Sequence, residues 1–529
     1  MADRVETSPA GFRRRAYDAV TALVGGTIGL FSPARAAFYC HGREVLRTYV
    51  AGEISGPNKN WRPRNKSADA EIKRAAKWLT ARARDQVQNN GYISGAIDKI
   101  CNNVVRKGIR PQACFKKGPD ELDTNLNNKV EKLWSRWARY ADITGHDSVA
   151  ALQRLILRHI WIDGEVLIHR VWDTSLKGIV PLRLEVIECD LLDARIDGPL
   201  SNGNIGRRGI EVDPETGKAV AYHVLESHPG DYLFMGVSGK SNPIPAADMI
   251  YVFDRRRASQ TRGISWLAAI IMEAYDISEY KGIERVGAKL AAAFGVFVKS
   301  SYPDLPGAGI GIPGGNQAKP VDTGVGWGDL PDYIDPGRIQ KLPFGADIKV
   351  AEHNRPGTQY EPYIRDGVRG MSAGAGISYE SFSNDRSNSS YSSGRDGSLE
   401  NRLSYGGQQF FLNEKLNNKL WAWFIEAAWM DGKLPELRNY AFDPLPYHEA
   451  VTWQNPGWTW VDPLKDSKAA DQGINNVTTT RTKINANQGE DWNETLDEAI
   501  REEEKLGKLY ELRAQNQKKL EENKHAVNA

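Results

Sequence analysis

Three short patterns in the sequence contain residue types that could carry chemistry, and the first resembles a phosphate-binding loop. Gly236–Ser241 ends in Gly-Lys-Ser, the three residues that close such a loop. Phe234 stands where the motif requires its leading glycine, and Asn242-Pro243 leaves no helix N-terminus that could hold a phosphate. The segment therefore does not predict nucleotide binding.

The second pattern is a formal match to the nucleophile elbow of serine hydrolases. Ser372 lies at the centre of Gly370-Met371-Ser372-Ala373-Gly374, but an elbow needs a buried strand before the serine and a helix after it. Residues 360–366 do not have the pattern of a buried strand. We therefore interpret the small residues as a surface for close helix packing, and keep a hydrolase that uses Ser372 as the alternative.

Two pairs of acidic residues could hold a magnesium ion or exchange protons: Asp163 with Glu165, and Glu188 with Asp190. No further motif ties either pair to a site, so we expect both to be solvated residues at strand edges. The four cysteines form no CxxC pair and have no histidine at zinc-ligand spacing. The sequence therefore predicts no catalytic residue, no cofactor and no metal site.

The elements that would position these residues begin with a run of helices. Ser67 has the residue type of a helix N-cap, and Ile72, Leu79 and Val87 recur at helical spacing until Asn89-Asn90-Gly91 ends the pattern. Further helices are predicted at 92–106, 125–140 and 148–161.

From Gly164 the hydrophobic period changes to two, which predicts strands. Residues 165–172 and 182–187 are expected to pair antiparallel, and 210–212 with 219–225 form a second hairpin around the turn 213–218. Residues 249–253 close this region as a strand. The fold class is therefore α+β, mainly α, with a mixed α/β part.

The second half of the chain is predicted to contain long helices. Residues 264–293 indicate one helix about 45 Å long. It is followed by a Gly/Pro-rich stretch, 300–337, between short strands at 294–299 and 346–351. A second helix is predicted at 358–376.

The next segment is serine-rich, since eight of the sixteen residues from Ser378 to Ser393 are serine. Such a composition buries little apolar surface and predicts a loop. Residues 394–430 follow as a very long helix, with Gly406-Gly407 as its expected kink. A helical tail ends the chain after a rigid aromatic turn at 456–463.

Composition limits the class of protein. The 529 residues are enough for two to four sub-structures, and 40% hydrophobic residues suffice for cores. The 69 basic and 67 acidic residues give a net charge of +2, so any contact with nucleic acid must be local or weak. Nothing in the composition suggests a membrane span.

Several segments, taken in order, resemble the lambda-like family of phage portal proteins. The resemblance covers roughly residues 70–500, is weakest at both ends and frays within 300–337. The segments that carry it are Arg82–Asp85, Asn89–Ile97, Asn102–Pro111, Asp163–Val166, Val186–Asp190, Phe253–Arg257, Gln260–Gly263, Gly376–Glu380, Tyr391–Ser393, Pro456–Trp458 and Val461–Lys465.

The resemblance implies a ring, usually of twelve copies, around a central channel. It also implies a division of each subunit into named parts. These are an N-terminal arm at 1–69, a wing at 70–263, a stem helix at 264–293, a clip at 294–357, a second stem helix at 358–376, a tunnel loop at 377–393, a long kinked helix that completes the wing at 394–459, and a crown at 460–529.

The implied function is the channel at one vertex of a viral head, through which double-stranded DNA is packaged and ejected. Implied partners are the terminase large subunit, the major capsid and scaffolding proteins, and a head-tail adaptor. The implied location is the virion. The resemblance also implies that the protein nucleates the head and that assembly takes place in the host cytoplasm. Because the chain lacks a phosphate loop, a separate ATPase must supply the energy. A head-to-tail adaptor is the other phage alternative, but adaptors are much shorter chains.

A channel that lets DNA slide needs weak phosphate contacts, because strong ones would act as a brake. The serine-rich segment offers neutral hydrogen-bonding groups and one arginine beside one aspartate. The residues expected to face DNA are Ser383, Asn384, Arg386, Asn388 and Tyr391. The stem residues expected at subunit boundaries or along the channel are Glu273, Lys281, Arg285 and Lys289.

Overall fold

The computed structural model describes residues 65–119, 121–175, 177–231, 239–293, 297–300, 346–349, 357–387 and 389–527. The chain divides into two compact units, Met1–Ser67 and Ala68–Ala529, and almost all described residues belong to the second. The predicted arm up to residue 64 and most of the predicted clip lie outside the described residues.

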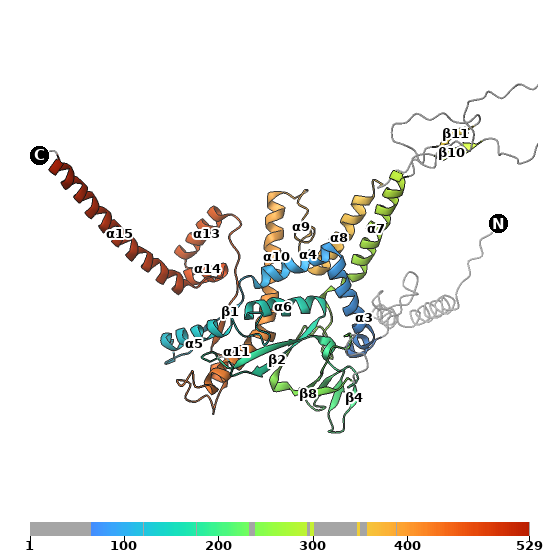
Figure 1. The fold of residues 1–529 in the computed structure, drawn as a ribbon, viewed down its shortest axis with the longest axis horizontal. Helices are drawn as coiled ribbons and strands as arrows, with labels where there is room; N and C mark the ends of the chain where they lie inside the picture. Colours follow the sequence, from blue (N-terminus) through green and yellow to red (C-terminus); the bar gives the residue numbers. More distant parts are fainter. Residues whose placement is uncertain are drawn as a thin grey trace, which may run out of the picture. The chain divides into compact units, whose positions relative to one another are not determined.

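The N-terminal run of helices is confirmed (Figure 1). Asn90 separates the first two helices, because its side chain accepts a hydrogen bond from the backbone N–H of Tyr92 and so starts a new helix. Asp123 and Ser148 cap the next two in the same way. The helices are α3 (Ala68–Asn89), α4 (Gly91–Val105), α5 (Thr124–Trp137) and α6 (Val149–Ile162).

Both predicted hairpins are confirmed. One antiparallel sheet has the order β3-β2-β9, and a second has the order β4-β5-β6-β7-β8. The first sheet consists of β2 (Glu165–Trp172), β3 (Leu182–Ile187) and β9 (Met249–Phe253). The second consists of β4 (Gly198–Pro199), β5 (Ile205–Arg207), β6 (Ile210–Val212), β7 (Ala219–Leu225) and β8 (Ser241–Pro245). A further strand pair joins β1 (Arg110–Ala113) to β12 (Val451–Gln454).

The helix predicted at 264–293 begins later than expected. A 3₁₀ turn, η6 (Trp266–Ala269), precedes α7 (Ile271–Ala293), because the Ser265 hydroxyl accepts from Leu267 N–H and starts the tighter turn. The predicted short strands are β10 (Phe297–Ser300) and β11 (Ala346–Lys349), which pair antiparallel. The second helix, α8 (Tyr360–Ala375), is confirmed.

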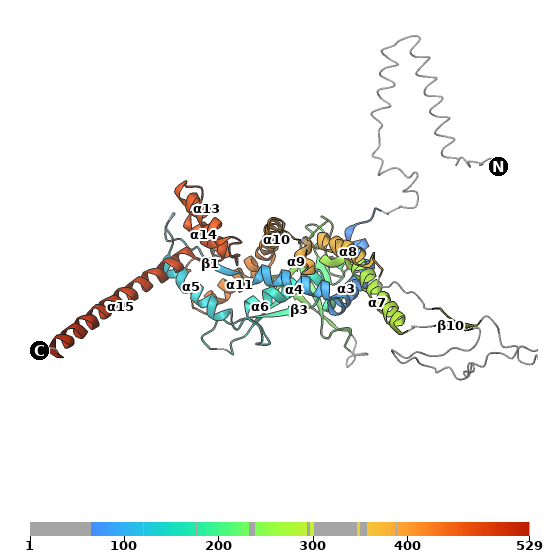
Figure 2. The same cartoon turned by 90° about the horizontal axis from the view of Figure 1, so that it is seen from above.

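α7 and α8 lie side by side, as Figures 1 and 2 both show. Glycines make this close approach possible. A Cβ at Gly374 would lie 2.3 Å from Cγ2 of Ile270, and one at Gly370 would lie 2.5 Å from an oxygen of Glu273. The predicted packing role of these small residues is therefore confirmed.

The composition of the serine-rich segment predicts one loop, and this prediction is wrong. The segment contains a short helix, α9 (Tyr379–Ser383), and its end already belongs to α10 (Tyr391–Leu412). Phe382 anchors α9, because its side chain is buried in the main hydrophobic core and only 4% exposed. Ser390 and Ser393 form a reciprocal capping box that starts α10.

The prediction that the long helix is kinked at Gly406-Gly407 is wrong. α10 runs through both glycines, and the irregular turn is η8 (Asn413–Asn417), a π-helical segment that continues into α11 (Asn418–Met430). Asn417 is 0% exposed, and its amide bonds Asn413 and Gln153 in the interior. The wider turn places these polar groups where they find partners, so buried hydrogen bonds rather than glycines decide its position.

The C-terminal part is helical, as predicted. Every residue from Leu496 to Lys518 is exposed. The helices are α12 (Leu445–His448), α13 (Pro463–Asn475), α14 (Arg481–Gln488) and α15 (Trp492–Val527).

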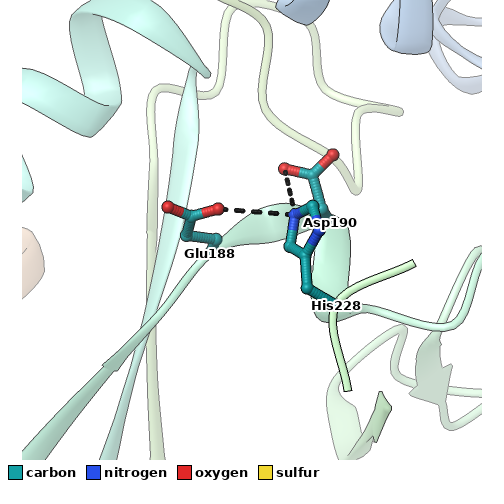
Figure 3. A group of neighbouring side chains, drawn as sticks. All are labelled: Glu188, Asp190 and His228. Carbon is teal, nitrogen blue, oxygen red and sulfur yellow. Dashed lines mark ion pairs between the residues drawn. The ribbon is translucent and has the colours of Figure 1, made fainter. Parts of the chain in front are cut away.

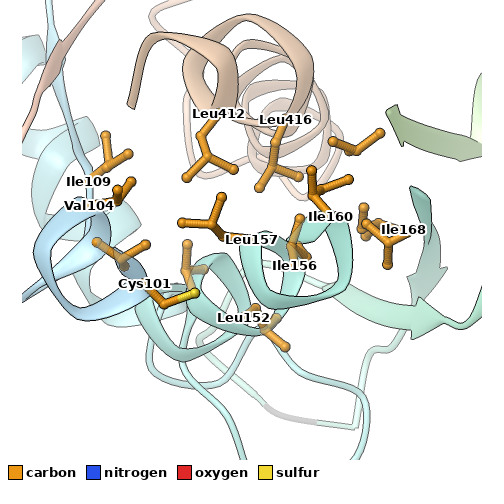
Figure 4. Close-up of a cluster of buried hydrophobic side chains, with 14 of the residues drawn as sticks. Cys101, Val104, Ile109, Leu152, Ile156, Leu157, Ile160, Ile168, Leu412 and Leu416 are labelled. Atoms are coloured by element: carbon orange, nitrogen blue, oxygen red, sulfur yellow. The ribbon is translucent and has the colours of Figure 1, made fainter. Parts of the chain in front are cut away.

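The larger core lies where α4, α6 and the α10–η8 junction meet (Figure 4). Val104, Leu157 and Leu412 are fully buried there. Trp134, Trp137, Trp421 and Phe424 extend this core with ring centroids 5.0–6.0 Å apart. No helix among the described residues combines the length and the apolar character that crossing a membrane requires.

Candidate functional site

Segments far apart in the sequence meet where β2 begins. The Arg84 guanidinium on α3 donates to Asp163 at 2.8 Å and to Asp190 at 2.6 Å. The second oxygen of Asp163 bonds the His159 ring at 2.7 Å. One arginine thus ties α3 to the end of α6 and to the turn that follows β3.

The first residue of β2 forms a second buried pair. The Arg262 guanidinium donates to Glu165 through two nitrogens: Nε lies 3.0 and 2.9 Å from the two carboxylate oxygens, and Nη2 bonds Oε1, which makes a forked contact. Glu165 also accepts from the Gly263 N–H at 2.6 Å and from the Tyr251 hydroxyl. The side chains of Arg262 and Glu165 are 5% and 6% exposed. This pair fixes the chain just before η6 and α7.

Gly164 lies between these two pairs and allows the backbones to touch. Its φ is +86°, and a Cβ there would lie 2.0 Å from the carbonyl carbon of Ile264. Both features require glycine.

The prediction that the acid pairs are solvated is wrong for Asp163 and Glu165. Both residues are buried, at 4% and 5% exposure. They are retained in the interior because each has a cationic partner from a distant segment. No pattern in the sequence identified Arg84 and Arg262 as those partners, although both lie within the motif segments.

Asp163 makes the stability of the fold sensitive to acid. Burial by itself raises the pKa of Asp163, but hydrogen bonds from His159 and Arg84 outweigh it and hold the pKa below its ordinary value. A carboxyl with a lowered folded pKa stabilises the fold above its unfolded pKa, and that contribution disappears as the pH falls through the folded pKa.

We therefore expect Asp163→Asn to unfold more easily than the unmodified protein at pH 7, and the difference to shrink as the pH falls below about 4. Denaturation midpoints measured from neutral to acid pH test this. Asp471→Asn, at an exposed position, is the matched control and should show no such convergence. If the difference in denaturation midpoint between the two proteins stays constant with pH, the charge of Asp163 does not stabilise the fold.

Glu188, Asp190 and His228 form a second group beside Arg84 (Figure 3). His228 Nε2 lies 3.6 Å from Glu188 and 3.9 Å from Asp190. Two carboxylates and an imidazole could ligate a divalent ion. Arg84, however, already donates to Asp190 and lies 3.8 Å from Glu188, so a positive charge occupies the place an ion would take. We interpret the group as an ion-pair network.

The expected DNA-facing residues lie on and after α9. Ser383 donates to the Tyr379 carbonyl at 2.7 Å, and Asn384 ends the helix in the left-handed conformation with φ +60°. Arg386 and Asn384 are exposed, and Tyr391 on the first turn of α10 is 66% exposed. Asn388 lies outside the described residues.

Arg386 and Asp385 are neighbours in the sequence, but the hydrogen bonds of Asp385 in the described part of the chain go to other residues. Asp385 instead accepts from Ser387 N–H at 3.0 Å, from the Ser387 hydroxyl at 2.6 Å and from the Tyr379 hydroxyl at 3.1 Å. These bonds lower the pKa of Asp385. The aspartate organises the loop, and Arg386 is left to project from it.

Lys99 on α4 was missed in the sequence and supports this loop. Its ammonium donates to the Asn384 side chain at 2.6 Å and to the Ser381 carbonyl. Burial and the nearby charge of Arg386 lower the pKa of Lys99. Only the position of α4 beside α9 reveals this role.

The structure brings some of the expected stem residues together with the loop. Lys281, Arg285 and Ser383 line one hollow of about 400 Å³ with the first residues of α4. Lys281 lies over the Tyr92 ring, 4.6 Å from its centroid. Glu273 does not join them because it packs against Gly370 of α8, and Lys289 lies farther along α7 on an exposed surface.

The structure places Ser372 inside helix α8 and Ser241 at the start of a strand. The Ser372 hydroxyl donates to the Arg369 carbonyl of its own helix at 2.8 Å. Ser241 begins strand β8 rather than a helix, and residues 236–238 lie outside the described residues.

The described residues form a mixed α/β part, two long helices separated in sequence by a strand pair, a folded serine-rich segment and a helical tail, which is the α+β organisation expected from the resemblance to portal proteins. The chain belongs to the lambda family of phage portal proteins, since the family model "Phage portal protein, lambda family" matches residues 55–409. Phage portal proteins are virion components.

Two relatives identified by sequence agree with this assignment. The chain is 30% identical over 476 residues to the "Probable portal protein" of Halomonas phage phiHAP-1, covering 88% of both chains. It is 22% identical over 493 residues to "Portal protein B" of Escherichia phage lambda, covering 87% of this chain and 91% of that one. A solved chain from the neck of an empty GTA particle is 13% identical, with a TM-score of 0.44, over 81% of this chain and 94% of that chain.

Proposed function

We propose that this portal protein assembles into a ring of twelve copies whose central channel passes double-stranded DNA during packaging and ejection. The family assignment supports this, and so does an exposed apolar stripe on α7. Met272, Tyr275, Ile283 and Val286 are each 49–57% exposed, which is unusual for large apolar side chains unless another surface covers them. Contacts between neighbouring subunits would cover this stripe.

In this proposal the parts of the subunit keep the assignments implied by the sequence. Residues 70–263 with 394–459 form the wing, α7 and α8 form the stem, 294–357 form the clip, 377–393 form the tunnel loop, and 460–529 form the crown. The buried pairs of Arg84 and Arg262 lie at the start of β2 and just before η6, so they would hold the stem to the wing.

The DNA contact would be made by the loop after α9 and the neighbouring cations. The observation that carries this is the exposed Arg386, which follows two residues after the Asn384 that Lys99 bonds, together with Lys281 and Arg285 on the hollow that Ser383 also lines. Asn384 and Tyr391 add neutral hydrogen-bonding groups. Repeated around a ring, these groups give a modest positive lining that touches phosphates without reading bases.

The expected consequence is weak, salt-sensitive and sequence-independent DNA binding by the assembled ring. Replacing Arg386 by glutamine should reduce the slope of log affinity against log salt by about one for each phosphate that the arginine no longer neutralises, equally for unrelated sequences. Fluorescence anisotropy with two short duplexes of different sequence measures this.

Lys505→Gln, on the exposed surface of α15, removes the same charge elsewhere and should leave the slope unchanged. The proposal for the loop fails if Arg386→Gln and Lys505→Gln behave alike, or if Arg386→Gln affects only one of the two sequences.

We further propose that the ring nucleates head assembly with the scaffolding and major capsid proteins in the host cytoplasm. The terminase large subunit would dock during packaging, and a head-tail adaptor would replace it afterwards. The portal chain itself would be no enzyme, so the terminase would supply the energy. ATP hydrolysis by the purified portal ring alone would contradict this division of labour.

A further inference from the structure

One face of α10 is apolar, acidic and uncovered. Leu403 is 79% exposed and Phe410 is 66% exposed, with Leu399 at 42%. These residues follow one another at helical spacing, so they share one side of the helix. Arg395, one turn before Leu399, is already paired with Asp466 at 3.2 Å. The exposed acids on the same side are Asp396 and Glu400 of α10 and Glu414 of the adjoining η8. We call the three apolar residues and these three acids the α10 face.

Two glycines open a notch in this face. Gly406 and Gly407 lie between Leu403 and Phe410, and a Cβ at either position would meet nothing within 4 Å. A side chain at either position would therefore meet no other atom in the described part of the subunit. This helix surface has one large apolar side chain on each side of a glycine notch, and such a notch can receive a bulky side chain from a partner.

A face of the opposite charge lies on α3. Trp78 is 67% exposed, and Arg74, Lys77 and Arg82 are exposed on the same side of the helix. Glu71 and Asp85 are the acids on this side; Glu71 pairs with Arg257 at 2.8 Å, and Asp85 accepts from Asn89 at 2.7 Å. We call Arg74, Lys77, Trp78 and Arg82 the α3 face.

The two faces belong to different sides of the same compact unit. α3 and α10 both pack on α4, which lies between them in Figure 1. Each helix buries one side in this packing and presents the other outward. The α3 face also adjoins the exposed Met272 and Tyr275 of α7, because Arg82 lines one small hollow with both.

We propose that the α10 face of one copy of this chain binds the α3 face of the next copy. This pairing rests on the proposed ring and specifies which surfaces close it. A closed ring needs two different complementary surfaces on each subunit. Here one surface carries three acids around a glycine notch, and the other carries three cations around an exposed tryptophan that could fill such a notch. Opposite charges favour this pairing and disfavour each face meeting its own copy.

The test reverses the charge of each face separately in the full chain. Asp396→Lys with Glu400→Lys gives a subunit in which both faces are basic. Arg74→Glu with Lys77→Glu gives a subunit in which both faces are acidic. Either variant alone should need a concentration at least about tenfold higher to form rings, because like charges then meet at every contact. Analytical ultracentrifugation and negative-stain microscopy measure the assembled fraction.

An equimolar mixture of the two variants should form rings again at the concentration that the unmodified chain requires. In the mixture every acidic face can meet a basic face of the other variant, so subunits alternate around the ring. Glu504→Lys with Glu511→Lys on the exposed α15 is the matched control and should assemble normally. Circular dichroism of each variant checks that the fold is intact.

The outcomes separate the inference from the proposed function. If the unmodified chain forms rings and both reversed variants do so equally well, the ring stands and these two faces do not close it. If each variant fails alone and the mixture also fails, the faces do not pair with each other. If the unmodified chain stays monomeric at every concentration, the proposed ring itself is wrong.

Discussion

Replacing Arg262 by methionine should lower the free energy of unfolding by about 3–5 kcal/mol. The substitution leaves the Glu165 carboxylate buried without its cation, while the Gly263 N–H and the Tyr251 hydroxyl remain as its hydrogen-bond donors. These two neutral donors cannot replace the forked contact of a guanidinium. Denaturation followed by tryptophan fluorescence measures the decrease.

The double variant Glu165→Gln with Arg262→Met is the matched control for charge. It removes the buried carboxylate together with its cation, and glutamine can still accept a hydrogen bond from Gly263. We expect it to regain a substantial part of the stability that Arg262→Met loses, because most of the decrease comes from the unpaired charge. Equal decreases in the single and double variants would show that the packing of Arg262 matters, rather than its pairing.

Replacing Trp137 by alanine should cost about 3–5 kcal/mol of stability. Trp137 is 0% exposed, and its ring packs 5.0 Å from Trp134 and 5.2 Å from Phe424, measured between centroids. Its indole N–H also donates to the Leu182 carbonyl at 2.7 Å. The substitution therefore leaves a cavity between α5 and α11 and removes one hydrogen-bond donor from the Leu182 carbonyl on β3.

Phe442→Ala is the control for this prediction, because Phe442 is 91% exposed and its truncation should change stability by no more than about 0.5 kcal/mol. The same denaturation experiment measures both variants. A decrease at Trp137 no larger than that at Phe442 would mean that the aromatic cluster is not a main source of stability.

Much of the secondary structure could be predicted because it follows from local pattern. Helix α4 begins at Asn90 because an asparagine there caps the backbone, and the β6–β7 hairpin forms because residues 213–218 favour a turn. The family could be predicted for a related reason. The segments that resemble the family are short, and their order along the chain can be read from the sequence without any structure.

Positions that depend on distant neighbours could not be predicted in the same way. Composition predicted that the serine-rich segment is a loop. Burial of Phe382 and the capping box at Ser390 instead give the segment helical parts. Gly406 and Gly407 suggested a kink, but the irregular turn lies at Asn413–Asn417, where buried amides need partners.

The sequence by itself determined the helices and hairpins, the order of the motifs and the family, because local propensity and short-range spacing decide these. Only the tertiary structure decided that Asp163 and Glu165 are buried ion-pair partners, that Lys99 supports the loop after α9, and that α3 and α10 present faces of opposite charge. The physical reason is that burial and electrostatic pairing depend on distances between residues that lie far apart along the chain. Arg84 and Asp190, for instance, are 106 positions apart in sequence and 2.6 Å apart in the fold.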